Sequence, residues 1–146
     1  MLRGPADLAR RADGRRDAGR ALNKWLALSA GGLVGTYLRV GVTAWLAGLA
    51  GGRFPYGTLA VNLSACFLIG VFNAVLGARA GVSPELRLLL MTGFCGAYST
   101  FSTLILETAY LVDGGHAALA LANWLASGAA GYLLFRLGTA LALAAG

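Results

Sequence analysis

The sequence has little charge, a single histidine and no clustered cysteines. Only 12% of its 146 residues are charged, whereas 58% are hydrophobic, which leaves too few polar side chains to coat a water-soluble domain. Cys66 and Cys95 lie in separate apolar stretches without paired spacing, so neither a disulfide framework nor a zinc knuckle is indicated. His116 is interpreted as a loop residue. We therefore expect lipid to surround this chain.

The apolar stretches also lack a catalytic constellation. They hold one carboxylate, Glu107, and no histidine, so a nucleophile with its base, a metal cluster and paired carboxylates are all missing, and an enzyme is not expected. Glu107 leaves one alternative open, a small proton-coupled transporter or exporter that would need an intramembrane acid. A small multidrug exporter would have its acid in the first span, where this chain has Arg39.

Four apolar stretches account for most of the chain. A bilayer core takes about 20 apolar residues per helix, and the stretches meet that length at about residues 25–48, 56–76, 86–112 and 117–140. The sequence therefore predicts an all-α, multi-pass protein of the cell membrane with four transmembrane helices. Residues 25–146 form this four-helix unit, which leaves no room for a separate soluble domain.

A basic segment precedes the first span. Seven of the twelve Lys and Arg residues lie in residues 1–24, offset only by Asp7, Asp13 and Asp17. Such a segment could contact nucleic acid or acidic lipid, but beside a membrane span it favours retention in the cytoplasm. We expect residues 1–24 to be a disordered cytoplasmic tail that is kept in the mature protein.

Small and hydroxyl residues shape the first and third spans. Gly31 and Gly35 have the spacing that lets two helix backbones approach closely in lipid. Ser83 followed by Pro84 and Glu85 favours the start of the third helix. Glycines and hydroxyls at residues 92–103 then predict that this helix is broken near its middle, a kinked but continuous helix being the alternative.

The spans carry neutral hydrogen-bonding groups in place of charges. They suit a small anion that must be stripped of water and then released, because fixed cations would hold it too tightly to conduct. The alternative is that they only join helices to one another. The groups are Asn62, Ser99, Thr100, Ser102, Thr103, Asn123 and Ser127.

Three ordered motifs resemble the CrcB/Fluc family of fluoride channels. Residues 31–39 (GGLVGTYLR) are similar to the first-helix signature, and residues 55–62 (PYGTLAVN) followed by Gly70 to the second. Residues 92–96 (TGFCG) and 99–103 (STFST), followed by Glu107, resemble the third. The fourth helix matches more loosely, through Ser127 and nearby glycines.

The resemblance implies a fluoride-selective channel that exports fluoride passively and lowers its cytoplasmic concentration. It implies an antiparallel dimer of four-helix subunits, a homodimer or a heterodimer with a homologous subunit, with two narrow pores. Asn62 would be a pore amide, and Phe101 would present its positive ring edge to the anion. Hydroxyls would come from Ser102, Thr103 and Ser127.

The resemblance also implies a structural sodium ion that is not transported. Backbone carbonyls of Gly96 and Ser99, with their counterparts from the partner, would bind it. Gly35, Arg39 and Glu107 would have structural roles.

The chain departs from the family pattern at three positions. Leu104 stands where the family usually has a second phenylalanine, Asn123 where tyrosine is frequent, and Ser99 where threonine is usual. Because leucine has no positive ring edge, a complete pore built by this subunit alone is in doubt. Serine in place of threonine at position 99 leaves the backbone carbonyl, the implied sodium ligand, unchanged.

The distribution of cations bears on the dimer. One membrane side would hold the seven tail cations with Arg79 and Arg87, and Arg136 close by, whereas the other would hold only Arg53. This bias should fix the N-terminus in the cytoplasm. It favours a heterodimer with an oppositely oriented subunit, the alternative being a shorter natural chain that inserts both ways.

Overall fold

The four predicted spans are present in the structure. The computed structural model describes residues 5–50, 52–79 and 81–145, and side chains from Gly19 onward in these ranges except that of Ala50. Every regular element among these residues is helical. The helices long and apolar enough to cross a membrane are Gly19–Leu49, Tyr56–Ala78, Pro84–Asp113 and Ala117–Ala144. The prediction of an all-α, multi-pass membrane protein is confirmed.

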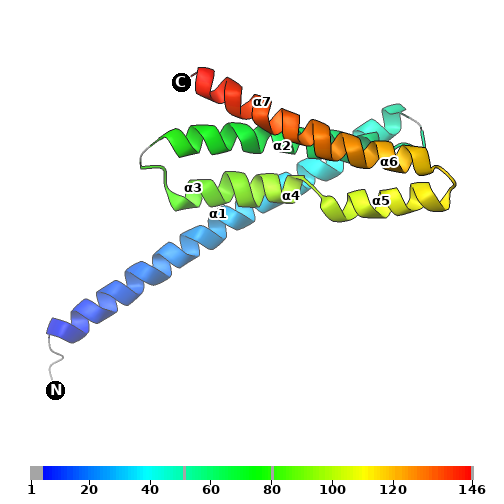
Figure 1. The fold of residues 1–146 in the computed structure, drawn as a ribbon. Coiled ribbons are helices and arrows are strands. Elements are labelled where there is room, and N and C mark those ends of the chain that lie inside the picture. The colour runs from blue at the N-terminus through cyan, green and yellow to red at the C-terminus, as the bar shows by residue number, and fades with distance from the viewer. Residues whose placement is uncertain (1–4, 51, 80, 146) are drawn as a thin grey trace.

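Two spans are single helices and two are composite. The first two are α1 (Pro5–Ala50) and α2 (Tyr56–Ala78). The third contains α3 (Pro84–Arg87), the π-helical η1 (Leu88–Cys95), α4 (Gly96–Tyr98) and α5 (Phe101–Asp113). The fourth contains α6 (Ala117–Leu125), the π-helical η2 (Ala126–Ala130) and α7 (Gly131–Ala144). Figure 1 shows the last three spans side by side, with α1 crossing them.

Helix α1 continues well beyond the bundle at its N-terminal end (Figure 1). Its 46 residues give a length of about 69 Å at 1.5 Å per residue, about twice the thickness of a hydrocarbon core. Residues 5–24, expected to be disordered, are helical here, because Ala, Leu and Arg favour helix and extending a helix needs no new nucleus. Residues 1–4 lie outside the described residues. The cytoplasmic location of the tail stays a prediction.

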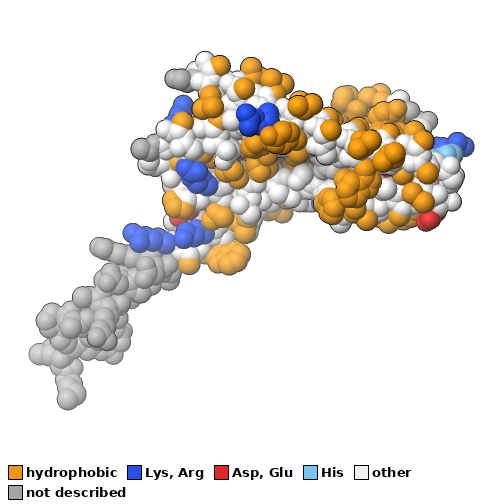
Figure 2. All heavy atoms as spheres, viewed as in Figure 1, with side chains coloured by type: hydrophobic (Ala, Val, Ile, Leu, Met, Phe, Trp, Pro, Cys, Tyr) orange, Lys and Arg blue, Asp and Glu red, His pale blue; other side chains and the backbone are white. Residues whose placement is uncertain are grey.

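Glycines set the closest helix contacts. A Cβ added at Gly31 would collide with the carbonyl oxygen of Leu89, and one at Gly35 with that of Phe94. Helix α1 therefore packs against η1 and α4 along this glycine face, while Leu33, Val34 and most of its other large side chains are exposed. The apolar surface in Figure 2 suits lipid.

The third span is broken where the sequence predicted. Ser83 caps its first turn, since its Oγ accepts the backbone N–H of Leu86 at 3.2 Å. Helix α4 ends at Tyr98, and Ser99 and Thr100 are extended, with φ/ψ of −75/161° and −152/114°. Helix α5 then begins at Phe101. The two π-helical stretches were not predicted.

Candidate functional site

Asn62 of α2 holds the break in the third span. The backbone N–H of Thr100 donates to Asn62 Oδ1 at 2.7 Å, and Asn62 Nδ2 donates to the Thr100 carbonyl at 3.1 Å. In a continuous helix the Thr100 N–H would instead bond the carbonyl of Gly96. The amide of Asn62 thus replaces a helical partner and stabilises the extended residues. The sequence singled out Asn62 as a costly polar group but did not identify its partner.

The hydroxyls that follow the break bond to one another. Thr100 Oγ1 caps α5 by accepting the Thr103 N–H at 3.3 Å, and it lies 2.9 Å from Thr103 Oγ1 and 3.4 Å from Ser102 Oγ. The Thr103 N–H is thereby diverted from the carbonyl of Ser99, its partner in a regular helix. Both carbonyls predicted to bind sodium, those of Gly96 and Ser99, have therefore lost their usual helical amide.

A cavity of about 260 Å³ opens beside the break. It brings together Asn62, Phe101 and Ser127 of the predicted pathway, whereas Ser102 and Thr103 do not line it. The Phe101 side chain is 66% exposed, and its ring meets that of Trp124 edge to face, with centroids 6.1 Å apart. The full lining is Asn62, Cys66, Ser99, Thr100, Phe101, Leu104, Trp124, Ser127 and Gly128. This lining contains no charged side chain.

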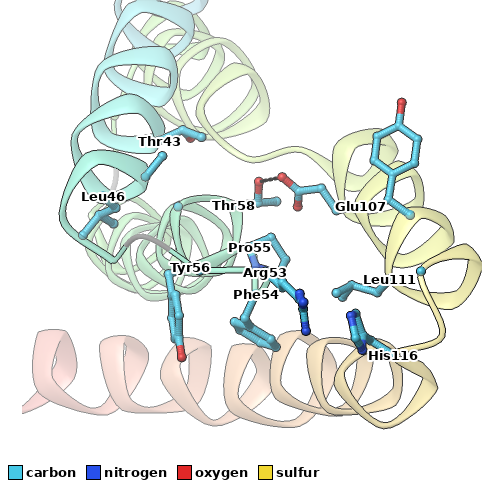
Figure 3. Close-up of a pocket in the computed structure, with 15 residues that line it drawn as sticks. Thr43, Leu46, Arg53, Phe54, Pro55, Tyr56, Thr58, Glu107, Leu111 and His116 are labelled. Atoms are coloured by element: carbon cyan, nitrogen blue, oxygen red, sulfur yellow. Dashed lines mark hydrogen bonds between the residues drawn. The ribbon is translucent and has the colours of Figure 1, made fainter.

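A second cavity, of about 510 Å³, lies at the end of the bundle where α1 meets α2. Glu107 faces it, and Thr58 Oγ1 donates to Glu107 Oε1 at 2.7 Å (Figure 3). Arg53 and His116 also line the cavity, from the loops that precede α2 and α6. Arg53 is positioned to place positive charge near an entering anion. His116, interpreted as a loop residue, does precede α6 directly.

Glu107 of the larger cavity, Ser127 of the smaller one and Asn123 of α6 carry buried polar atoms without partners. Among the described residues, Glu107 Oε2, Ser127 Oγ and both amide atoms of Asn123 are buried without a hydrogen-bond partner, and Asn123 is 0% exposed. Glu107 lies six residues before Asp113, the end of α5, and Asn123 six after Ala117, the start of α6. The two are therefore at similar depth, and Ser127 follows one turn beyond Asn123.

Buried polar groups are nearly always hydrogen-bonded, so the unpartnered atoms of Glu107, Asn123 and Ser127 (the row) require an explanation. Glu107 lines the larger cavity and Ser127 the smaller one. Water would satisfy all of these atoms, whereas a small anion would pair only with the two donors, Asn123 Nδ2 and Ser127 Oγ. Asn123 was counted among the neutral donors but was not assigned to the pathway. Its four-residue spacing from Ser127 was the available signal.

The remaining predicted residues lie apart from the row. Gly96 is exposed, and a Cβ there would approach nothing nearer than the Met91 carbonyl at 3.9 Å. Arg39 is half-buried on α1, and Gly35 packs against the backbone of Phe94 and Tyr98. Leu104 is buried, 5% exposed, and lines the smaller cavity.

The arrangement favours passage of an anion over tight binding of an ion. Neutral amides and hydroxyls can replace part of a hydration shell without the strong attraction of a fixed cation. In the described part of the chain, His, Cys, Asp and Glu form no cluster of three or more that could hold a metal. A carbonyl site at the break would not involve those side chains.

Comparison with known proteins agrees with these features. Residues 26–139 match the family described as CrcB-like protein, Camphor Resistance (CrcB). The chain is 43% identical over 115 residues to the fluoride-specific ion channel FluC of Acidobacterium capsulatum, covering 79% of this chain and 92% of the relative. It is 42% identical over 116 residues to that of a Synechococcus species, covering 80% and 89%. Identity to that of Rhizobium leguminosarum bv. trifolii is 47% over 92 residues, covering 63% and 74%.

Proposed function

Because the chain belongs to the CrcB-like family, we propose that it is a subunit of a fluoride-specific channel. The channel lets fluoride leave the cytoplasm passively across the plasma membrane and so lowers its concentration there. The observation that carries this proposal is the row of buried, unpartnered polar atoms, whose donors are Asn123 Nδ2 and Ser127 Oγ. The relatives are named as ion channels and not as enzymes, in agreement with the missing catalytic groups.

The row explains how fluoride could be both dehydrated and released. Arg53, which lines the larger cavity, attracts an anion toward it. The amide of Asn123 and the hydroxyl of Ser127 then donate hydrogen bonds one turn apart. The exposed Phe101 lines the smaller cavity, and Asn62 has one amide hydrogen left after bonding Thr100.

The test is fluoride efflux from liposomes that hold the purified chain, alone and with a homologous subunit of opposite charge bias. We expect rapid efflux that is indifferent to an imposed proton gradient. Glu107→Gln should stay within about tenfold of wild type, because glutamine keeps an oxygen acceptor for the Thr58 hydroxyl. Efflux that requires a proton gradient and is lost in Glu107→Gln would instead establish the proton-coupled transporter.

A structural sodium ion fits the break. The carbonyls of Gly96 and Ser99 are the ones whose helical amides are diverted, to Asn62 and Thr100 respectively. Carbonyl oxygens are suitable ligands for a monovalent cation. Bound there with the counterparts from a partner, sodium would neutralise converging carbonyl dipoles and so hold two subunits together.

Replacing sodium by N-methylglucamine should therefore dissociate the dimer, as followed by light scattering during size-exclusion chromatography. Ser99→Ala should be mild, costing about 1 kcal/mol at most, because it removes only the 2.9 Å hydrogen bond from Ser99 Oγ to the Cys95 carbonyl. Gly96→Leu should leave the subunit folded, since space is open around Gly96, but should prevent pairing. A dimer that is indifferent to sodium removal would refute the site.

We further infer an antiparallel dimer in which this chain is one half of a heterodimer. The exposed Phe101 and the cavity that opens beside it leave a surface for a partner to complete. The cation bias opposes insertion in both orientations. Leu104 stands where the family usually has a phenylalanine, and a partner that has this phenylalanine could complete one of the two pores. The partner would be a homologous subunit of opposite orientation.

A tag at the C-terminus tests the orientation. In spheroplasts and inverted vesicles it should be accessible from the cytoplasmic side only, because the cations lie overwhelmingly on that side. The chain alone should then give no fluoride flux, and flux should return when an oppositely oriented homologue is added. A tag population divided between both sides, together with flux from the chain alone, would rule out the obligate heterodimer.

A further inference from the structure

A further cavity, of about 500 Å³, lies where α1 enters the bundle, at the opposite end of that helix from the Glu107 cavity. Its lining combines charge and apolar surface in one place. The residues are Arg20, Ala21, Lys24, Trp25, Leu28 and Leu88. This cleft, defined by these six residues, is outside the proposed ion path.

The cleft has a cationic mouth and an apolar floor. Arg20, Lys24 and Leu28 follow one another at four-residue intervals, so they share one face of α1. Both cations are exposed, whereas Leu28 of α1 and Leu88 of η1 are half-buried. Trp25 is 67% exposed beside them. Charged and apolar side chains therefore lie within about two turns of a single helix.

The position of the cleft matches a membrane boundary. Helix α1 carries no charged side chain from Trp25 to Leu38, and Arg20 and Lys24 lie just before this stretch. Tryptophan is enriched at the level of the lipid headgroups, as Trp25 would be here. Arg79, Arg87 and Arg136 are exposed at the same end of the bundle, and Figure 2 shows the blue side chains gathered there. Such an end faces the cytoplasmic leaflet, which carries the anionic lipids.

We propose that the cleft binds an anionic phospholipid of that leaflet. The phosphate lies between Arg20 and Lys24, the indole of Trp25 lies at the headgroup level, and an acyl chain runs over Leu28 and Leu88. The apolar floor and its place at the boundary select a lipid over a free phosphate, which would use only the cations. This site is independent of the channel function proposed above.

The test is native mass spectrometry of the full chain in detergent, titrated with phosphatidylglycerol and with phosphatidylcholine. Wild type should bind phosphatidylglycerol more tightly. The double variant R20Q/K24Q should weaken phosphatidylglycerol binding on the order of 30-fold, the effect of two cations removed from an anionic headgroup. The matched control R79Q/R136Q removes two exposed cations from the same end and should bind as wild type does.

Three outcomes would overturn the proposal. Equal loss in both double variants would mean a general charge effect without a site. Equal affinity for the two lipids in wild type would exclude recognition of the anionic headgroup. Displacement of phosphatidylglycerol by equimolar soluble glycerol phosphate would mean that the cleft binds a free phosphate compound. Because all four substituted residues are exposed, the variants should fold, which monodisperse elution would verify.

Discussion

Asn62→Leu is expected to abolish fluoride flux. The leucine leaves the backbone N–H and carbonyl of Thr100 without the partners that Asn62 provides at 2.7 and 3.1 Å, and Thr100 is only 8% exposed. Two unsatisfied groups cost on the order of 2 to 6 kcal/mol together. The break should therefore reorganise and close the smaller cavity. Efflux from liposomes and thermal unfolding in detergent would measure both effects.

Two further variants separate the pathway role of Asn62 from its structural one. Asn62→Asp retains an oxygen acceptor for the Thr100 N–H but loses the N–H that Asn62 donates to the Thr100 carbonyl. It should therefore lower stability less than Asn62→Leu, while its carboxylate repels the anion and flux falls. Asn73→Leu removes an exposed amide from the same helix and should leave both quantities unchanged. Normal flux in Asn62→Leu would contradict a role for this residue in conduction.

Gly35→Leu is expected to prevent recovery of a folded subunit. Even the first carbon of a side chain at Gly35 would collide with the carbonyl oxygen of Phe94, and this neighbour is backbone that cannot rotate away. Overpacking typically costs about 1–3 kcal/mol, and more where backbone must shift. Separating α1 from η1 and α4 would also displace the broken span. The yield of monodisperse protein after chromatography is the measurement.

The neighbouring Gly32 supplies the matched control. No atom outside the adjoining turns of α1 lies within 4 Å of a Cβ built at Gly32. Gly32 shares its helix and its bilayer surroundings with Gly35. Gly32→Leu should therefore give wild-type yield and flux. Similar loss in both variants would show that helix propensity or insertion, not the contact with Phe94, decides the outcome.

Local signals were sufficient for the elements and for the break. Hydropathy alone marked the spans, because the cost of unpaired backbone groups in lipid permits only helices there. Ser83 was recognised as a cap because Pro84 and Glu85 follow it, and its Oγ does accept the Leu86 N–H. Glycines and hydroxyls around Ser99 predicted the discontinuity, since they support the helix poorly and can bond freed backbone groups.

The candidate site was predicted only in part. Asn62, Phe101 and Ser127 line one cavity, as their polarity and the motifs suggested. The π-helical η1 and η2 escaped prediction because their wider turns depend on how neighbouring helices pack. Asn123 was recognised as polar, but its complete burial and lack of a partner could not be read from the chain.

The sequence by itself determined which segments cross the membrane, where the third one breaks and which end carries the cations. These properties depend on residues within a few positions of one another. Only the tertiary structure decided that Asn62 bonds Thr100, 38 residues away, and that the polar atoms of Asn123 and Ser127 are buried without partners. Such pairings depend on the approach of helices at glycine contacts, and that geometry belongs to the assembled bundle, not to any single span.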